Sequence, residues 1–98
     1  MAAKIPLEPL GPPFVVRVSP VPSRGAVQLA WPGATQPVEV RIFDVSGALR
    51  RSVNLAPGSI GYRWDGEDER GVATAAGIYF ARVRSAGVTR VTRVVRAR

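Results

Sequence analysis

The chain of 98 residues contains neither cysteine nor histidine. Without cysteine there is no thiolate nucleophile and no disulfide, and without both residue types there is no Cys/His zinc site. A Ser-His-Asp or Cys-His triad needs an imidazole base, which the sequence also lacks. The composition therefore predicts a protein that is not an enzyme and that carries no cofactor.

Long apolar runs are also absent. No stretch approaches the roughly 20 apolar residues that a transmembrane helix needs. The start of the chain, from Met1 to Lys4, does not lead into the apolar core of a signal peptide, because Pro6, Glu8 and Pro9 interrupt it. We therefore expect any contact with a membrane to be peripheral.

Acidic residues are few: seven Asp and Glu stand against 14 Lys and Arg, which gives a net charge of +7. A basic surface suits nucleic acid, anionic lipid or an acidic protein. The alternative interpretation is that the arginines reflect GC-rich coding and simply supply the polar outward side of surface strands.

Proline is concentrated at the start, where residues 1–13 hold four of the nine prolines. Proline has no amide donor and a fixed φ, so this stretch is predicted to be an extended arm or linker. Leu7 and Leu10 are candidates for docking the arm onto a partner. We place the folded domain at residues 14–98.

From residue 14 onward, short apolar stretches alternate with turn signals, and no segment sustains a helical period. The pattern amounts to about seven strands with a turn signal roughly every 8–12 residues, which is typical of an immunoglobulin-like or fibronectin-III-like sandwich. The sequence therefore predicts an all-β fold with antiparallel sheets. The expected core residues are Val27, Leu29, Val38, Val40, Ile42, Trp64, Tyr79 and Val83.

Six sequence blocks follow one another in a fixed order along the chain. They are PVPSRG at 20–25, VRIFDVSG at 40–47, YRWDG at 62–66, DERG at 68–71, AGIYFARV at 76–83 and TRVTRVVR at 89–96. Their order resembles the immunoglobulin-like domain of the flagellar hook-capping protein, and even more the C-terminal sorting domain of type IX secretion cargo. The resemblance implies a bacterial, non-catalytic interaction or sorting module in the periplasm or at the cell surface. Its implied partners are other proteins of an envelope or secretion assembly, with no small-molecule substrate.

Two other functions remain open. The first is a free-standing accessory subunit that scaffolds a larger periplasmic or membrane-peripheral complex, and the start of the chain at its own Met1 favours it. The second is a basic nucleic-acid-binding module, which depends on charge alone. Nucleic-acid binding is disfavoured, because base-stacking aromatic residues are not interleaved with the arginines in the sequence.

The motif around Trp64 and Asp65 has a structural interpretation. Trp64 is expected to fill the core, and Asp65 to cap the loop that follows. The loop also carries Glu67, Asp68 and Glu69, which are weak candidates for a calcium site because calcium takes several oxygen ligands. Their spacing matches no EF-hand loop, and a solvated loop tip is the simpler interpretation, so we predict no metal site.

Arginines recur along the last two expected strands. If these strands pair as a hairpin, their arginines can form one basic stripe for phosphates or an acidic partner. The alternative is a solvated face whose charges block edge-to-edge aggregation. The candidate partner-binding residues are Leu7, Leu10, Arg82, Arg84, Arg90, Arg93 and Arg96.

Overall fold

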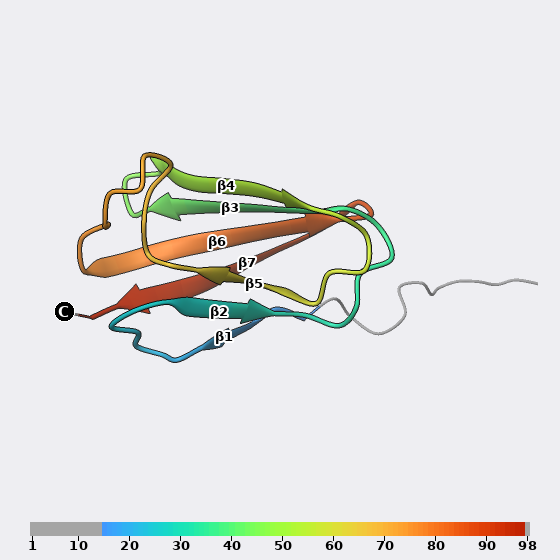
Figure 1. Cartoon of the computed structure of the whole chain (residues 1–98), viewed down its shortest axis with the longest axis horizontal. Coiled ribbons are helices and arrows are strands. Elements are labelled where there is room, and N and C mark those ends of the chain that lie inside the picture. Colours follow the sequence, from blue (N-terminus) through green and yellow to red (C-terminus); the bar gives the residue numbers. More distant parts are fainter. Residues whose placement is uncertain (1–14, 98) are drawn as a thin grey trace, which may run out of the picture.

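Strands make up all the regular secondary structure of residues 15–97, the part of the chain that the computed structural model describes. The strands are β1 (Arg17–Ser19), β2 (Val27–Ala30), β3 (Val38–Asp44), β4 (Leu49–Leu55), β5 (Gly61–Trp64), β6 (Gly77–Ser85) and β7 (Val88–Arg96). They form a three-stranded sheet, β1-β2-β5, and a four-stranded sheet, β4-β3-β6-β7, and every pairing is antiparallel (Figure 1). The prediction of an immunoglobulin-like sandwich of about seven strands is confirmed.

Alternation along the strands places the core between the two sheets. In β3, Val38, Val40 and Ile42 are buried, whereas Glu39 and Arg41 between them are only half-buried. All eight residues predicted for the core are buried. Further buried apolar side chains complete it: Trp31, Ala34, Ala81 and Val94.

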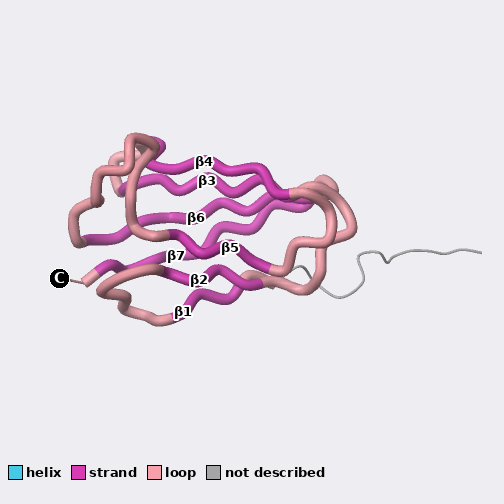
Figure 2. Tube along the Cα trace, in the orientation of Figure 1, coloured by secondary structure: helices cyan, strands magenta, loops and turns pink. Residues whose placement is uncertain are grey.

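The strands run along the long axis of the domain, so the loops gather at its two ends (Figure 2). The end near the C-terminus carries the β3–β4 turn, the long loop between β5 and β6 and the loop between β1 and β2. Loops carried by a rigid sandwich are common positions for binding. In the described part of the chain, nothing meets the length and apolarity that a membrane-spanning helix requires.

The loop between β1 and β2 is attached to the end of β7 through Ser23. This residue is fully buried and pairs in parallel with Arg96. Its N–H donates to the Val95 carbonyl at 2.8 Å, and its carbonyl accepts from the Ala97 N–H at 2.7 Å. Its hydroxyl donates back to its own loop, to the Gly25 carbonyl at 2.9 Å. The small polar residue in the PVPSRG block is therefore needed for packing and hydrogen bonding.

The predicted arm at residues 1–13, with Leu7 and Leu10, lies outside the described residues. Its separation from a domain at 14–98 stays a prediction.

Candidate functional site

Trp64 anchors the long loop between β5 and β6. The side chain is fully buried, and its ring meets the Tyr79 ring edge-on with 5.4 Å between centroids. Its indole Nε1 donates to the Glu67 carbonyl at 2.9 Å, and Asp65 Oδ1 accepts from the Glu67 N–H at 2.9 Å. The roles predicted for Trp64 and Asp65, as a core residue and a loop cap, are confirmed.

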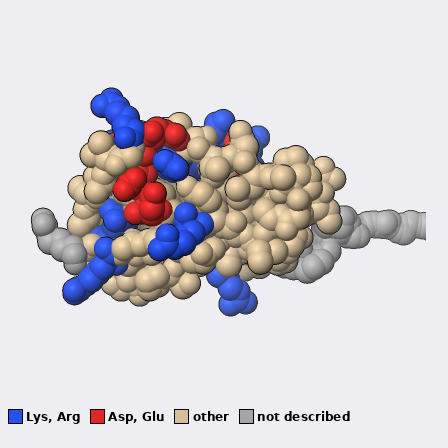
Figure 3. All heavy atoms as spheres, in the orientation of Figure 1, with Lys and Arg blue, Asp and Glu red and all other residues tan. Residues whose placement is uncertain are grey.

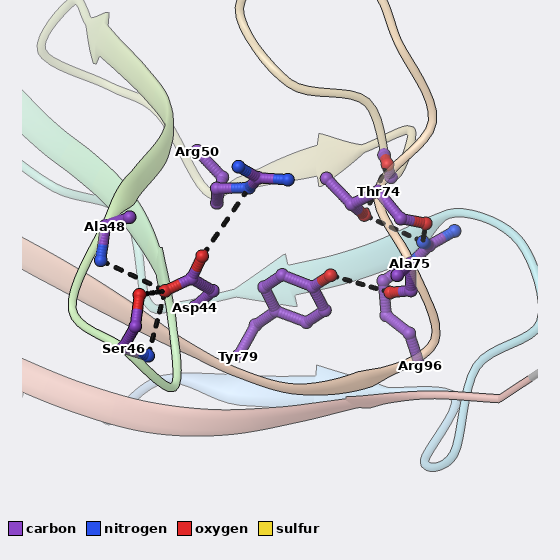
Figure 4. Close-up of polar contacts among 9 residues, drawn as sticks. Asp44, Ser46, Ala48, Arg50, Thr74, Ala75, Tyr79 and Arg96 are labelled. Carbon is purple, nitrogen blue, oxygen red and sulfur yellow. Dashed lines mark hydrogen bonds and ion pairs between the residues drawn. The ribbon is translucent and has the colours of Figure 1, made fainter.

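Arg96 closes the same end of the domain from β7. Its guanidinium carbon lies 5.5 Å from the centroid of the Trp64 ring. Nη1 donates to the Thr74 carbonyl at 2.7 Å and to Thr74 Oγ1 at 2.8 Å (Figure 4). The Thr74 hydroxyl in turn donates to the Gly66 carbonyl at 2.7 Å. Arg96 was predicted to bind a partner, and the structure places its guanidinium in contacts within the domain.

The acidic loop uses its carboxylates to shape its own backbone. Asp68 Oδ1 accepts from the Val72 N–H at 3.0 Å and from the Arg70 N–H at 2.9 Å, and these bonds, led by the one from Val72, lower the pKa of Asp68. The Glu69 carboxylate accepts from the Ser52 N–H on β4. Across residues 15–97 no group of acidic side chains is arranged to hold a metal ion. The carboxylates of Asp65, Asp68 and Glu69 are therefore hydrogen-bonded to backbone N–H groups, and the weak calcium hypothesis for Asp65, Glu67, Asp68 and Glu69 stays untested.

The β6–β7 hairpin divides the predicted arginines between two sides of the sheet. Arg82 and Arg84 lie on the outer face, because they alternate along β6 with residues that point into the core. Arg93 lies on the same face, because it pairs with Phe80 and paired residues share a side of the sheet. Arg90 and Arg96 lie on the opposite side of the sheet, which also carries the buried Val94. The basic stripe on the outer face is therefore shorter than the sequence suggested.

The outer face of the four-stranded sheet is organised around Glu39. Arg41 Nη2 lies 3.0 Å from Glu39 Oε2, whereas Arg84 Nη1 and Arg82 Nη2 lie 3.7 and 3.9 Å from Oε1. The guanidinium of Arg82 also lies over the Phe43 ring, 5.3 Å from its centroid. Three arginines share one carboxylate, so this face remains positively charged.

Apolar side chains lie between these arginines. Ile78, Phe80 and Val91 are exposed on the outer face, and Phe80 pairs with Arg93 across the hairpin. The argument that aromatic residues are not interleaved with the arginines is therefore wrong in three dimensions. Phe80, Arg82 and Arg84 already alternate along β6, and the pairing with β7 brings Arg93 to the same face.

Acidic and basic side chains lie side by side at one end of the surface shown in Figure 3. Figure 3 shows Asp and Glu side chains gathered toward the end of the domain that carries the C-terminus, with Lys and Arg side chains around them. The surface in this view offers mixed charge at one end and a largely uncharged stretch at the other. Such a surface suits recognition of proteins through charge complementarity.

The comparisons with known proteins agree with the fold. A family model described as the FlgD Ig-like domain matches residues 16–87, and no curated protein matches the chain. A solved structure of PorZ from Porphyromonas gingivalis, described as an essential bacterial surface component of the type-IX secretion system, is similar in fold, with a TM-score of 0.69, 24% sequence identity and coverage of 85% of this chain. Dimeric latent PorU from the same organism has a TM-score of 0.63 and 27% identity over 84% of this chain. The chain corresponds to only 11% of PorZ and 9% of PorU.

Proposed function

The chain belongs to the FlgD Ig-like domain family, and on this premise we propose that it is a non-catalytic interaction module of a bacterial cell envelope, used in sorting through the type IX secretion route. Its proposed place is the periplasm or the cell surface. Its proposed partners are proteins of the secretion assembly.

The observation that carries this proposal is the likeness, over most of the chain, to PorZ, which is described as a surface component of the type-IX secretion system, and to PorU. The sequence of PorU is 27% identical to this chain over 84% of this chain's length. The shared part is a small domain of those larger proteins, which suits a module for docking.

The arrangement of residues supports a role in binding. Over residues 15–97 the carboxylates form turns and ion pairs, and the core is filled by apolar side chains. Binding would use the basic and apolar outer face, where arginines attract an acidic partner and Phe80 and Val91 supply apolar contact area.

Export of a fused reporter tests the sorting role. We expect a reporter that carries its own signal peptide, joined to the N-terminus of the 98-residue chain, to reach the surface of a bacterium with a type IX system, and to stay in the periplasm when that system is deleted. A matched control carries an unrelated immunoglobulin-like domain of similar size. Equal surface delivery with both domains would refute the sorting role.

A second candidate function is an accessory subunit that braces the secretion machinery. It is favoured because PorZ, which is similar in fold, is described as an essential surface component of the type-IX secretion system. Purification of the native protein separates the two roles. A stable complex of fixed stoichiometry at the 98-residue mass supports the subunit, whereas recovery only as the tail of a larger precursor supports the sorting module.

A further inference from the structure

The last strand, β7, forms one edge of the four-stranded sheet. It pairs with β6 through a two-residue turn that is closed by Ser85 and Val88. In such a ladder, alternate residues direct their N–H and C=O groups toward the partner strand or away from it. Val95 faces away from β6, because its carbonyl accepts from the Ser23 N–H. The residues of β7 that share this direction therefore present their backbone groups at the free edge: Thr89, Val91 and Arg93.

This edge is occupied at its two ends and open in the middle. Ser23 covers it beside Val95, and the Arg90 guanidinium donates to the Thr89 carbonyl at 3.0 Å. Between these points, the backbone groups of Val91 and Arg93 pair with no other strand of residues 15–97, although β1 of the facing sheet lies close to β7. The side chain of Val91 is also 61% exposed. A free row of N–H and C=O groups beside an exposed valine is suited to pairing with another strand.

The opposite edge of the same sheet is protected, which makes the opening at β7 distinctive. On β4, the Ser52 N–H is bound by the Glu69 carboxylate. The neighbouring Arg51 donates to the Asp68 carbonyl at 3.2 Å, so the acidic loop is held against this edge. Such covering prevents unwanted pairing of edge strands.

The charge of β7 selects the kind of segment that can pair with it. The strand carries arginines and no acidic residue, and within the described part of the chain Arg93 has no acidic partner. A second copy would bring the same arginines to the edge, and like charges across paired strands are destabilising. The prolines of residues 1–13 lack N–H groups and cannot supply a regular ladder.

We propose that the free edge of β7, from Thr89 to Arg93, receives an extended acidic segment of a partner protein as an added strand. This inference rests on the proposed function as an interaction module, and it names the docking surface and the chemistry of the partner. Backbone hydrogen bonds to Val91 and Arg93 hold the segment, and its carboxylates lie next to Arg93 on the outer face.

Amide hydrogen exchange of the full chain tests the pairing directly. The probe is a short peptide of alternating Val and Glu, and a peptide of alternating Val and Lys is its control. We expect the acidic peptide to slow exchange of the Val91 and Arg93 amides at least about tenfold. The Thr92 amide, which already bonds to β6, should not change. An acidic peptide that binds without protecting these edge amides would overturn the proposal.

Two substitutions sharpen the test. Val91→Pro removes a donor at the edge and leaves the bonds to β6 intact, so it should weaken peptide binding about tenfold. Arg93→Glu should weaken it as well, whereas Arg63→Glu, which makes the same charge change on exposed β5, should not. If Val91→Pro unfolds the chain, the comparison of Arg93→Glu with Arg63→Glu tests the proposal instead. Equal loss in both glutamate variants indicates general attraction and contradicts docking at the edge.

Other occupants give distinct results. Protection of the edge amides that rises with protein concentration, without peptide, would indicate a second copy and would overturn the proposal. Protection of the same edge amides by a single-stranded oligonucleotide, and not by the acidic peptide, would indicate a nucleic-acid partner and would also overturn the proposal. The failure of the proposed function is separable, because export of the wild-type reporter is measured independently. An exported domain whose edge amides are never protected keeps its function and refutes only the edge proposal.

Discussion

Arg93 and Arg96 show how much a single residue's role depends on which way its strand faces. The sequence of β7 contains two adjacent valines, Val94 and Val95, so the alternation does not reveal which parity points inward. Pairing with β6 resolves this, because Val94 lies opposite buried Tyr79. Arg96 then reaches Trp64, and Arg93 points to the outer face. The arginines were therefore identifiable as candidates from the sequence, but their division required the register.

Gly66 is the residue whose replacement should reveal the contact with Arg96. Its φ is +85°, and a Cβ there would clash with Nη2 of Arg96, whose Nη1 donates to Thr74. We expect Gly66→Ala to lower the free energy of unfolding by about 2–4 kcal/mol, from backbone strain and displacement of Arg96. Urea unfolding measures this loss.

Gly47→Ala is the matched control for this prediction. Gly47 has a similar φ of +89°, but a Cβ there would meet nothing within 4 Å. We expect this variant to show only the backbone strain, about 1 kcal/mol. Equal losses at the two positions would mean that Arg96 contributes nothing to the anchoring of the loop.

At the scale of elements, strands and their apolar faces follow from period-two alternation, and contacts distant in sequence do not. The alternation in β3 predicted its buried face correctly. The bond from Glu69 to the edge of β4, and the position of Arg82 over Phe43, join segments that no local pattern relates. Turn residues are an intermediate case, since Gly87 favours a turn between β6 and β7 but does not by itself determine the backbone conformation of that turn.

The β6–β7 turn should be improvable at Ala86. Ala86 and Gly87 have φ of 53° and 78°, and both central residues of a type I′ turn require such positive values. Asparagine tolerates this conformation better than alanine, so Ala86→Asn should raise the free energy of unfolding by about 0.5–1 kcal/mol. Ala48→Asn, in the β3–β4 connection where φ is not positive, is the control. A lower unfolding midpoint for Ala86→Asn would contradict this assignment of strain.

At the scale of the whole molecule, the fold is encoded redundantly and the partner is not. Strand patterning, turn residues and the ordered blocks all predict one sandwich, so the fold and family were accessible from the sequence. The outer face combines residues from three strands: Glu39 of β3 pairs with Arg84 of β6, and Phe80 pairs with Arg93 of β7. A docking surface of this kind exists only after the strands are in register, and net charge alone does not locate it.

Two hydrogen-bonded aspartates and the net positive charge together predict how the stability of the fold responds to acid. Asp44 Oδ1 accepts from the Ser46 hydroxyl at 2.6 Å and from two backbone N–H groups (Figure 4), and these bonds, led by the one from Ser46, lower its pKa below 3.8. The pKa of Asp68 is lowered in the same way, mainly by the Val72 N–H. A lowered folded-state pKa contributes stability that is present above the unfolded value and is lost as pH falls through the folded value. Protonation of the seven carboxylates also raises the net charge from +7 to +14, which adds repulsion to the compact state.

We therefore expect the urea midpoint to fall steadily from about pH 5 to about pH 2. In the variant Asp44→Asn with Asp68→Asn, the amide oxygens keep the acceptors but cannot titrate, so this dependence should flatten. A variant at Glu67, whose side chain accepts none of these bonds, should retain the wild-type slope. If the double variant loses stability as steeply as the wild type, the two turns do not titrate with folding, and repulsion among the arginines alone accounts for the acid sensitivity.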